Sequence, residues 1–397
     1  MSGPVRGREP SPGARPRGLA RADLTAVLTA EQLLGPVPGG IGRYVSALVR
    51  HLPPVAAARG GTVRFVTGRH PAERLAEVGL DPAATTALSL PGRLLNRTWV
   101  AGRRPRLPGP LMEGADVVHA TSAALPPAGG RPLVVTVHDL AFHQHPEAYP
   151  RAGRAWHERA TRIAVAEASL FVAPSSATAR DLSDLYGVEP ARVAVVPLGV
   201  EPSDGDRGAA RRLLADLGVR GPFLLAVGTL EPRKNLRRLL NAFATLSEEL
   251  TDHHLVVVGP TGWGPDLSPI MANPWDTVRI KLAGQVADPV LHGLYGLADG
   301  LAYPSLYEGF GLPVLEAMAH GTPVLTSNRS SLPEVAGDAA ILVNPVSTES
   351  IATGLRSLVG DEALRARLRA AGPERAARFT WSATAEATWT VYRRAAA

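Results

Sequence analysis

Short apolar runs alternate with amphipathic stretches along most of this chain, and the alternation limits the fold more than any other feature. In the first half, the apolar runs cover residues 24–28, 63–66, 117–120, 133–138, 170–172 and 193–196. Because these runs lack polar alternation, they predict strands that are covered on both faces. Helical patterns lie between several of them, at residues 41–52, 154–168 and 176–186. This order is typical of a parallel sheet with helices on both sides.

The alternation pauses between residues 197 and 222, where one short helical piece is expected at residues 209–217. It restarts with FLLAVG at Phe223 and continues through HLVVVG, VRIKLAG, LAYP and TPVLTS. Further helices are expected at residues 236–250 and from Pro313 onward. Two such series predict an α/β protein with two Rossmann-like parallel-sheet domains that face a central cleft. Ligands of such sheets bind at the carboxyl ends of the strands.

These patterns suggest four parts of the chain. Residues 1–20 form a basic tail that is rich in Pro and Gly, lacks the apolar core of a secretory signal and is expected to be disordered. Residues 21–200 form an N-terminal domain. Residues 201–380 form a C-terminal domain, with residues 201–221 as the linker region. Residues 381–397 form a helix that we expect to pack back on the N-terminal domain.

The composition excludes several classes of protein. The chain has no cysteine, which excludes disulfides and thiolate metal sites. Lys plus Arg exceed Asp plus Glu by 42 − 36 = +6, which fits a solvated surface, attraction to phosphate ligands or an anionic membrane face. Basic and aromatic residues do not interleave, so we expect no nucleic acid partner. No apolar run reaches the about 20 residues that span a bilayer. We therefore expect a cytoplasmic protein, with peripheral contact to the inner membrane face left open.

The segment EGFGLPVLE, from Glu308 to Glu316, follows a predicted strand and opens a helix. Gly309 and Gly311 permit close backbone approach, and Pro313 fits the first helical position. The free amides of the first helical turn, at the positive end of the helix dipole, suit an anion such as a diphosphate. Each glutamate can accept two hydrogen bonds side by side, which matches a vicinal diol of ribose or hexose. Without its neighbours, the pair would indicate no more than a capped helix with acidic residues near its start.

The longer string EGFGLPVLEAMAHGTPV resembles the signature of glycosyltransferase family 4, a retaining family with the GT-B architecture. The resemblance implies that Glu308 contacts the donor hexose and that Glu316 binds the ribose hydroxyls. It also implies that the loop at Gly309, with the amides of Phe310, Gly311 and Leu312, meets the diphosphate and sugar. The same resemblance implies that residues 21–200 form the acceptor-side domain and that residues 201–380 form the domain that binds the nucleotide-sugar.

The loop GTLEPRKN, at residues 228–235, places Arg233 and Lys234 side by side after a strand. Cations aimed at a departing nucleoside diphosphate stabilise the transition state. Unpaired cations are unfavourable at a helix start, which favours a ligand over a merely solvated pair. Many family members have Arg where this chain has Thr229. The form seen here resembles a mannosyltransferase-like subgroup.

Three further strand-end loops carry candidate residues. In PGGIGRY, the resemblance implies that Gly40 approaches the donor diphosphate, although the turn lacks the full G-x-G-x-x-G spacing. His138, in HDLAF, is expected to bond a donor sugar hydroxyl or to steady the reacting centre, with a structural role as the alternative. The resemblance implies that Val286 lies against the nucleotide base, while Asp288 and Pro289 also suit the start of a helix.

Two sets of possible metal ligands are set aside. Asp204 and Asp206 form a D-x-D in the linker with no strand before them. Asp139, His143 and His145 have a spacing that fits no known kind of metal site. We therefore expect no metal and no cofactor apart from the nucleotide-diphosphate sugar itself.

The resemblance implies a retaining hexosyltransferase, with mannose from GDP-mannose as the favoured donor. The acceptor is expected to be a saccharide, a lipid-linked sugar or a natural product, and UDP- and dTDP-hexoses remain open as donors. A sugar-nucleotide epimerase and a non-catalytic nucleotide-sugar binder are the alternatives. A nicotinamide-dependent oxidoreductase would need a complete G-x-G-x-x-G and an acidic residue about 20 positions later, and the sequence has neither.

Overall fold

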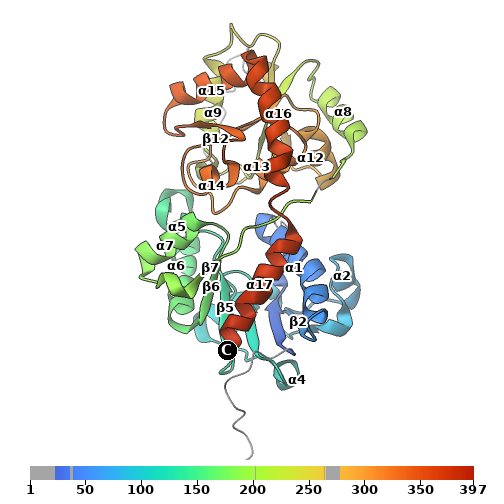
Figure 1. Ribbon diagram of the computed structural model, residues 1–397, viewed down its shortest axis with the longest axis vertical. Helices are drawn as coiled ribbons and strands as arrows, with labels where there is room; N and C mark the ends of the chain where they lie inside the picture. Colours follow the sequence, from blue (N-terminus) through green and yellow to red (C-terminus); the bar gives the residue numbers. More distant parts are fainter. Residues whose placement is uncertain (1–22, 36–38, 202, 263, 265–277) are drawn as a thin grey trace, which may run out of the picture.

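The computed structural model describes residues 23–35, 39–201, 203–262, 264 and 278–397. It consists of two α/β units, one above the other along the long axis of the molecule (Figure 1). Each unit contains one sheet in which all pairs of neighbouring strands are parallel. The prediction of two parallel-sheet domains is therefore confirmed.

The first sheet has seven strands in the order β3-β2-β1-β4-β5-β6-β7. Its strands are β1 Thr25–Thr29, β2 Thr62–Thr67, β3 Thr85–Ala87, β4 Val117–Ala120, β5 Leu133–Thr136, β6 Leu170–Ala173 and β7 Val193–Val195. Every residue of β4, β5 and β6 is buried, as expected for strands covered on both faces. Strand β3 was not predicted, because its sequence TTA carries no apolar run.

The helices of the first unit follow or precede these strands along the chain. The α-helices are α1 Gly39–Ala57, α2 Ala72–Glu77, α3 Gly92–Gly102, α4 Gly109–Met112, α5 Ala141–Gln144, α6 Arg151–Glu167 and α7 Ser176–Tyr186. The 3-10 helices are η1 Glu31–Leu34, η2 Pro82–Ala84, η3 Pro146–Ala148 and η4 Pro190–Arg192. Local signals set the ends of α7: the side chain of Ser175 accepts a hydrogen bond from the amide of Thr178, and Gly187 ends the helix with φ of 64°.

The second sheet has six strands in the order β10-β9-β8-β11-β12-β13. Its strands are β8 Phe223–Val227, β9 His254–Val258, β10 Ile280–Gly284, β11 Gly300–Tyr303, β12 Val324–Ser327 and β13 Ala340–Val343. The helices of this unit are α8 Arg207–Asp216, η5 Pro232–Lys234, α9 Leu236–Ala244, α12 Asp288–Tyr295, α13 Leu312–Ala319, α14 Leu332–Ala336, α15 Thr348–Gly360 and α16 Glu362–Ala376. Helix α9 ends six residues before the predicted residue 250, in a turn that closes on Leu250.

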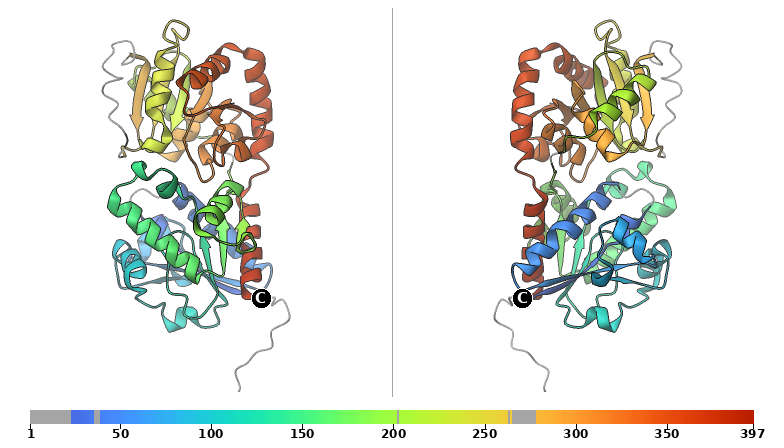
Figure 2. Two further views of the ribbon diagram at one scale, coloured as in Figure 1. Left: turned by 90° about the vertical axis from the view of Figure 1, so that its left-hand side faces the viewer. Right: turned by 90° about the vertical axis from the view of Figure 1, so that its right-hand side faces the viewer.

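The last helix, α17 Trp381–Ala396, leaves the second unit and packs against the first, beside α1 (Figure 2). Its buried Tyr392 hydroxyl lies 2.6 Å from Nδ1 of His119 in β4, and Nε2 of the same ring lies 2.7 Å from the Thr136 hydroxyl in β5. The chain therefore passes between the units twice. The two passages lie side by side, because the amide of Val200 donates to the carbonyl of Phe379 at 3.0 Å.

Candidate functional site

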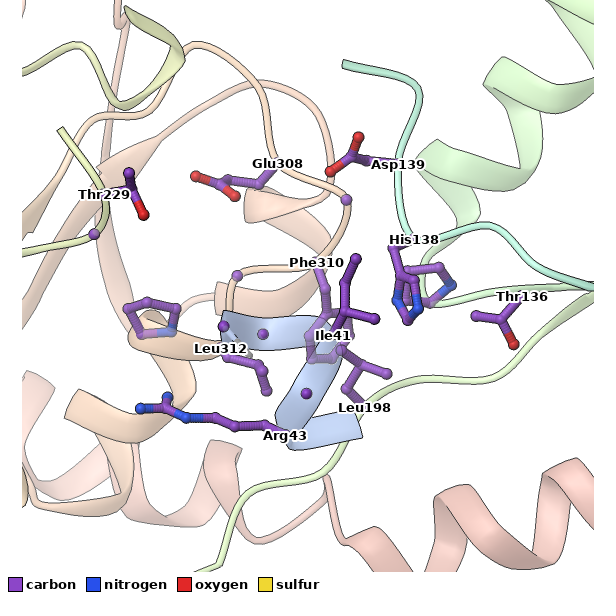
Figure 3. Close-up of a pocket in the computed structure, with 18 of the residues that line it drawn as sticks. Ile41, Arg43, Thr136, His138, Asp139, Leu198, Thr229, Glu308, Phe310 and Leu312 are labelled. Atoms are coloured by element: carbon purple, nitrogen blue, oxygen red, sulfur yellow. The ribbon is translucent and has the colours of Figure 1, made fainter. Parts of the chain in front are cut away.

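A cleft of about 1020 Å³ lies where the carboxyl ends of both sheets meet (Figure 3). Its size is at the upper end of ordinary small-molecule sites. Ten of the eleven predicted site residues line it: Gly40, His138, Arg233, Lys234, Val286, Glu308, Gly309, Phe310, Gly311 and Leu312. Glu316 is the exception among the predicted residues. The strand-end loops of both units thus contribute to one site.

Glu308 is the most strongly held carboxylate in this cleft. Its Oε1 accepts hydrogen bonds from Lys234 Nζ at 2.6 Å and from the Tyr303 hydroxyl at 2.8 Å, and its Oε2 accepts from Arg233 Nη1 at 2.7 Å. Burial alone would raise the pKa of Glu308, but the attraction of Arg233 and Lys234 outweighs it and lowers the pKa to about 2. Glu308 is therefore ionised and fixed in one orientation.

The two cations of the GTLEPRKN loop are nearly buried beside this carboxylate. The Nε of Arg233 also lies 2.7 Å from Oε1 of Glu231, in an ion-pair contact whose angle does not satisfy a hydrogen bond. Burial and repulsion by Arg233 lower the pKa of Lys234, although its contacts with Glu308 and Glu231 oppose that shift. Two cations and two carboxylates thus balance in charge. A donor phosphate has to compete with Glu308 and Glu231 for these cations.

Serine hydroxyls hold the backbone of the Glu308–Phe310 turn. Ser331 donates to the carbonyls of Glu308 at 2.8 Å and Phe310 at 2.6 Å, while the amide of Glu308 donates to Ser330 Oγ at 3.1 Å. Gly311, with φ of 121°, then leads into α13, which begins at Leu312. Pro313 is accordingly the second helical residue and not the first, and its missing N–H is still one that has no partner within the helix.

The same turn touches the first unit at Gly309. The carbonyl of Gly309 accepts a hydrogen bond of 2.7 Å from Ser175 Oγ. A Cβ placed on Gly309 would lie 1.8 Å from the carbonyl oxygen of His138. Glycine is therefore required here by the close approach of the two backbones.

His138 lies at the end of β5 on the opposite wall of the cleft. Its Nε2 lies 2.9 Å from the carbonyl oxygen of Thr121, so the N–H at this nitrogen donates to that carbonyl. Burial lowers the pKa of His138, which keeps the ring neutral. In this tautomer Nδ1 is a hydrogen-bond acceptor, suited to receive a proton from a hydroxyl but unable to donate one.

Glu316 lies one turn inside α13 and is only 5% exposed. Its Oε2 accepts a hydrogen bond of 2.9 Å from the Tyr295 hydroxyl, and its Oε1 accepts one from Arg43 Nη1. Arg43 belongs to α1 of the first unit and also reaches Asp288 Oδ1 at 3.2 Å. The carboxylate expected to bind ribose is thus paired across the cleft.

Several residues of this site were not assigned a role from the sequence. Arg43 is part of the PGGIGRY motif, in which only Gly40 received a role. Tyr303 lies in the predicted strand LAYP, and neither it nor Tyr295 received a role, since nothing local shows where a tyrosine hydroxyl points. Asp288 does not cap α12 with its side chain but pairs with Arg43.

The described residues hold no group of three or more His, Asp or Glu side chains suited to a metal ion. Asp206 of the linker D-x-D instead caps α8, where its Oδ1 accepts from the amide of Ala209 at 2.8 Å. Across the described part of the chain, none of the helices combines the length and apolar character that crossing a bilayer requires.

Comparison with known proteins places the chain in a family. The family model described as Glycosyl transferases group 1 matches residues 216–375, and the model described as Glycosyltransferase Family 4 matches residues 38–204. O-antigen chain mannosyltransferase B of Escherichia coli is 32% identical over 272 residues, which cover 66% of this chain and 70% of that protein. D-inositol 3-phosphate glycosyltransferase of Kineococcus radiotolerans is 37% identical over 295 residues, 66% of each chain. The chain thus spans about two thirds of the length of these relatives.

Solved structures share the fold. Sucrose-phosphate synthase from Thermosynechococcus elongatus superimposes with a TM-score of 0.69 at 20% identity, over 94% of this chain and 98% of that one. Anabaena Alr3699/HepE in complex with UDP and glucose gives 0.70 at 20% identity, over 93% and 99%. Two parallel-sheet units around this cleft therefore define a glycosyltransferase of the GT-B architecture. The chain belongs to glycosyltransferase family 4.

Proposed function

We propose that this chain transfers a hexose, mannose from GDP-mannose in the first instance, with retention of anomeric configuration. The observation that carries the proposal is the fixed Glu308 carboxylate, bonded to Lys234 at 2.6 Å and Arg233 at 2.7 Å where the diphosphate-binding turn meets the first unit. This arrangement offers an acceptor for sugar hydroxyls and two cations for a leaving diphosphate in one place.

The donor is the finer part of the proposal. The name of O-antigen chain mannosyltransferase B supports mannose, and the subgroup resemblance of HDLAF and GTLEPRKN points the same way. The complexes of Alr3699/HepE with UDP and UDP-glucose make a UDP-hexose the second candidate, ahead of dTDP-hexoses.

The reaction proceeds by front-face substitution. The C–O bond between the sugar and the diphosphate breaks, the acceptor oxygen bonds to the anomeric carbon on the same face, and the leaving phosphate oxygen takes the acceptor proton. The residues of the chain position the donor and stabilise the charge that develops in the transition state. Glu308 orients the hexose, Arg233 and Lys234 stabilise the developing phosphate charge, and Glu316 holds the ribose. No metal or cofactor is required in this proposal.

The acceptor is a saccharide, a lipid-linked sugar or a natural product. We propose a cytoplasmic location, with peripheral contact to an anionic membrane face that the net charge of +6 supports. Vesicles with and without anionic lipid would test the contact by co-sedimentation, and equal binding to both would contradict it.

A thermal-shift screen with GDP, UDP, dTDP and ADP, each alone and as its hexose conjugate, tests the donor. GDP and GDP-mannose are expected to raise the melting temperature most, because a ligand that binds only the folded state stabilises it. A larger shift with UDP would replace GDP-mannose by a UDP-hexose. Incubation of the preferred donor without acceptor, followed by sugar analysis, distinguishes the epimerase, which would change the sugar itself. Product NMR then establishes the anomeric configuration.

A further inference from the structure

Arg43 is the residue through which α1 of the first unit reaches the ribose-binding carboxylate of the second. Its Nη1 donates to Glu316 Oε1, and its Nη2 lies 3.2 Å from Asp288 Oδ1. The Arg43 side chain is 32% exposed and lines the cleft, whereas the Glu316 side chain is 6% exposed and lies behind it. The guanidinium therefore stands between the cleft and the carboxylate. Figure 3 shows Arg43 extending beneath Leu312.

The other oxygen of Glu316 is also occupied. Tyr295 is fully buried, and its hydroxyl donates to Oε2 at 2.9 Å from the side of α12. A ribose diol requires both carboxylate oxygens from the cleft side, because its two hydroxyls donate in parallel. Tyr295 is fully buried and does not line the cleft, whereas Arg43 is partly exposed and lines it.

We propose that Arg43 covers Glu316 while the donor site is empty and that ribose hydroxyls replace it when a donor nucleotide binds. Arg43 then keeps Asp288 as its partner. This inference rests on the proposed function, since it takes Glu316 as the ribose-binding residue. It makes Arg43 a residue that sets donor affinity, through an ion pair that has to be given up on binding.

The test compares GDP with 2′,3′-dideoxy-GDP, which lacks the hydroxyls that bind Glu316, by calorimetric titration of the full-length protein. The measured quantity is the ratio of the dideoxy Kd to the GDP Kd. Losing a cation weakens attraction to both diphosphates alike, so that effect cancels in the ratio. Arg43→Met is expected to raise the ratio about fivefold or more, a usual size for coupling between two competing contacts. UDP and its dideoxy analogue replace this pair if UDP binds more tightly.

Arg59→Met is the matched control. Arg59 follows the end of α1 and pairs with Glu386 of α17 away from the cleft, with a side-chain exposure of 39%. The ratio for this variant is expected to equal that of the wild type. Arg43→Lys should give an intermediate ratio, because a point charge does not fork onto Glu316 and Asp288 together.

The outcomes separate the inference from the proposed function. An unchanged ratio in Arg43→Met would refute the proposal that Arg43 covers Glu316. A lowered ratio would refute it as well, because Arg43 would then help Glu316 to hold ribose. Glu316→Gln should bring the ratio close to one. If it leaves the ratio at the wild-type value, or if the wild type binds no nucleotide, the site assigned under the proposed function is wrong and the inference falls with it.

Discussion

The ammonium group of Lys234 lies 2.6 Å from Oε1 of Glu308, so the cation expected to face the donor phosphates is bonded to the carboxylate expected to face the hexose. The two roles are thus coupled through one hydrogen bond. Mutating either residue removes the charged partner of the other. The effects of single substitutions at these two positions will therefore not be additive.

Lys234→Met should lower kcat about 10²- to 10³-fold, the usual effect of removing one group that stabilises charge in the transition state. The linear methionine fills most of the space, so the fold should persist, as circular dichroism would show. Lys281, the chain's only other lysine, lies on β10, and Lys281→Met is the control, with a rate close to the wild type. A rate for Lys234→Met near that of the control would exclude Lys234 from the reaction.

Gly309→Ala should separate the two units at the cleft. The new methyl group would lie 1.8 Å from the carbonyl oxygen of His138, so one backbone has to move by more than an ångström. Displacements of that size cost roughly 10²-fold in rate. The expected result is a fall in kcat/KM with a larger radius of gyration in solution scattering. Gly153→Ala in α6 is the control. A Cβ built on Gly153 would meet no atom within 4 Å outside its own stretch of helix, so this substitution should change neither quantity.

Stability should fall as the pH drops below the ordinary histidine range. Burial lowers the pKa of His119 from 6.5 to about 3, so between these values the unfolded chain binds a proton that the folded chain does not. The free energy of unfolding contributed by this histidine is then fully present above pH 6.5 and decreases by about 2 kcal/mol between pH 6.5 and 5. Burial also lowers the pKa of His138, which adds a loss of the same sign.

Urea unfolding of the wild type and His119→Gln at several pH values measures this contribution. The variant should be less stable at pH 7 but should lose less stability than the wild type on going to pH 5. Parallel pH profiles for the two proteins would show that His119 does not titrate as described.

Trp389→Ala should destabilise the first unit through the last helix of the chain. Trp389 is 2% exposed, and its ring packs so closely on Gly61 that a Cβ there would lie 2.6 Å from it. Removing a large buried aromatic side chain costs about 3–5 kcal/mol. Arg393→Ala, on the exposed face of α17, should change stability by less than about 0.5 kcal/mol in the same denaturation experiment.

A chelator should leave the reaction unaffected, since Arg233 and Lys234 supply the positive charge proposed to meet the diphosphate. With EDTA present, the transfer rate should stay within about twofold of the rate without it, whereas a metal-assisted reaction would lose a large factor. Restoration of activity by added Mg²⁺ or Mn²⁺ after such a loss would contradict this prediction.

Much of the fold was predictable because buried parallel strands carry continuous apolar runs. The runs at β8 and β9 place those strands within a residue of their observed bounds. Strand β3 was not predicted, because its partly exposed threonines carry no apolar run and form a strand only through pairing with β2. Strand β13 was not predicted either, since it is a partly exposed edge strand whose place is set by β12.

The cleft residues were predictable where a local motif carries them, as in the turn that begins at Glu308. Arg43 and Tyr295 were not, because their contacts with Glu316 join residues far apart in the sequence. A long side chain gives no local signal of its partner. Only the assembled pair of sheets brings a guanidinium of α1 to a carboxylate of α13.

The return of α17 to the first unit also affects how the molecule responds to a protease. A cut in the linker near Ser203 would leave the two units joined through the second passage at Phe379, whose carbonyl bonds Val200. The nicked protein should elute as one particle and separate into two fragments only in detergent. The first unit is not a contiguous segment, because α17 completes it from the far end of the chain. A gene cut at the linker would therefore leave the first unit without the helix that covers it.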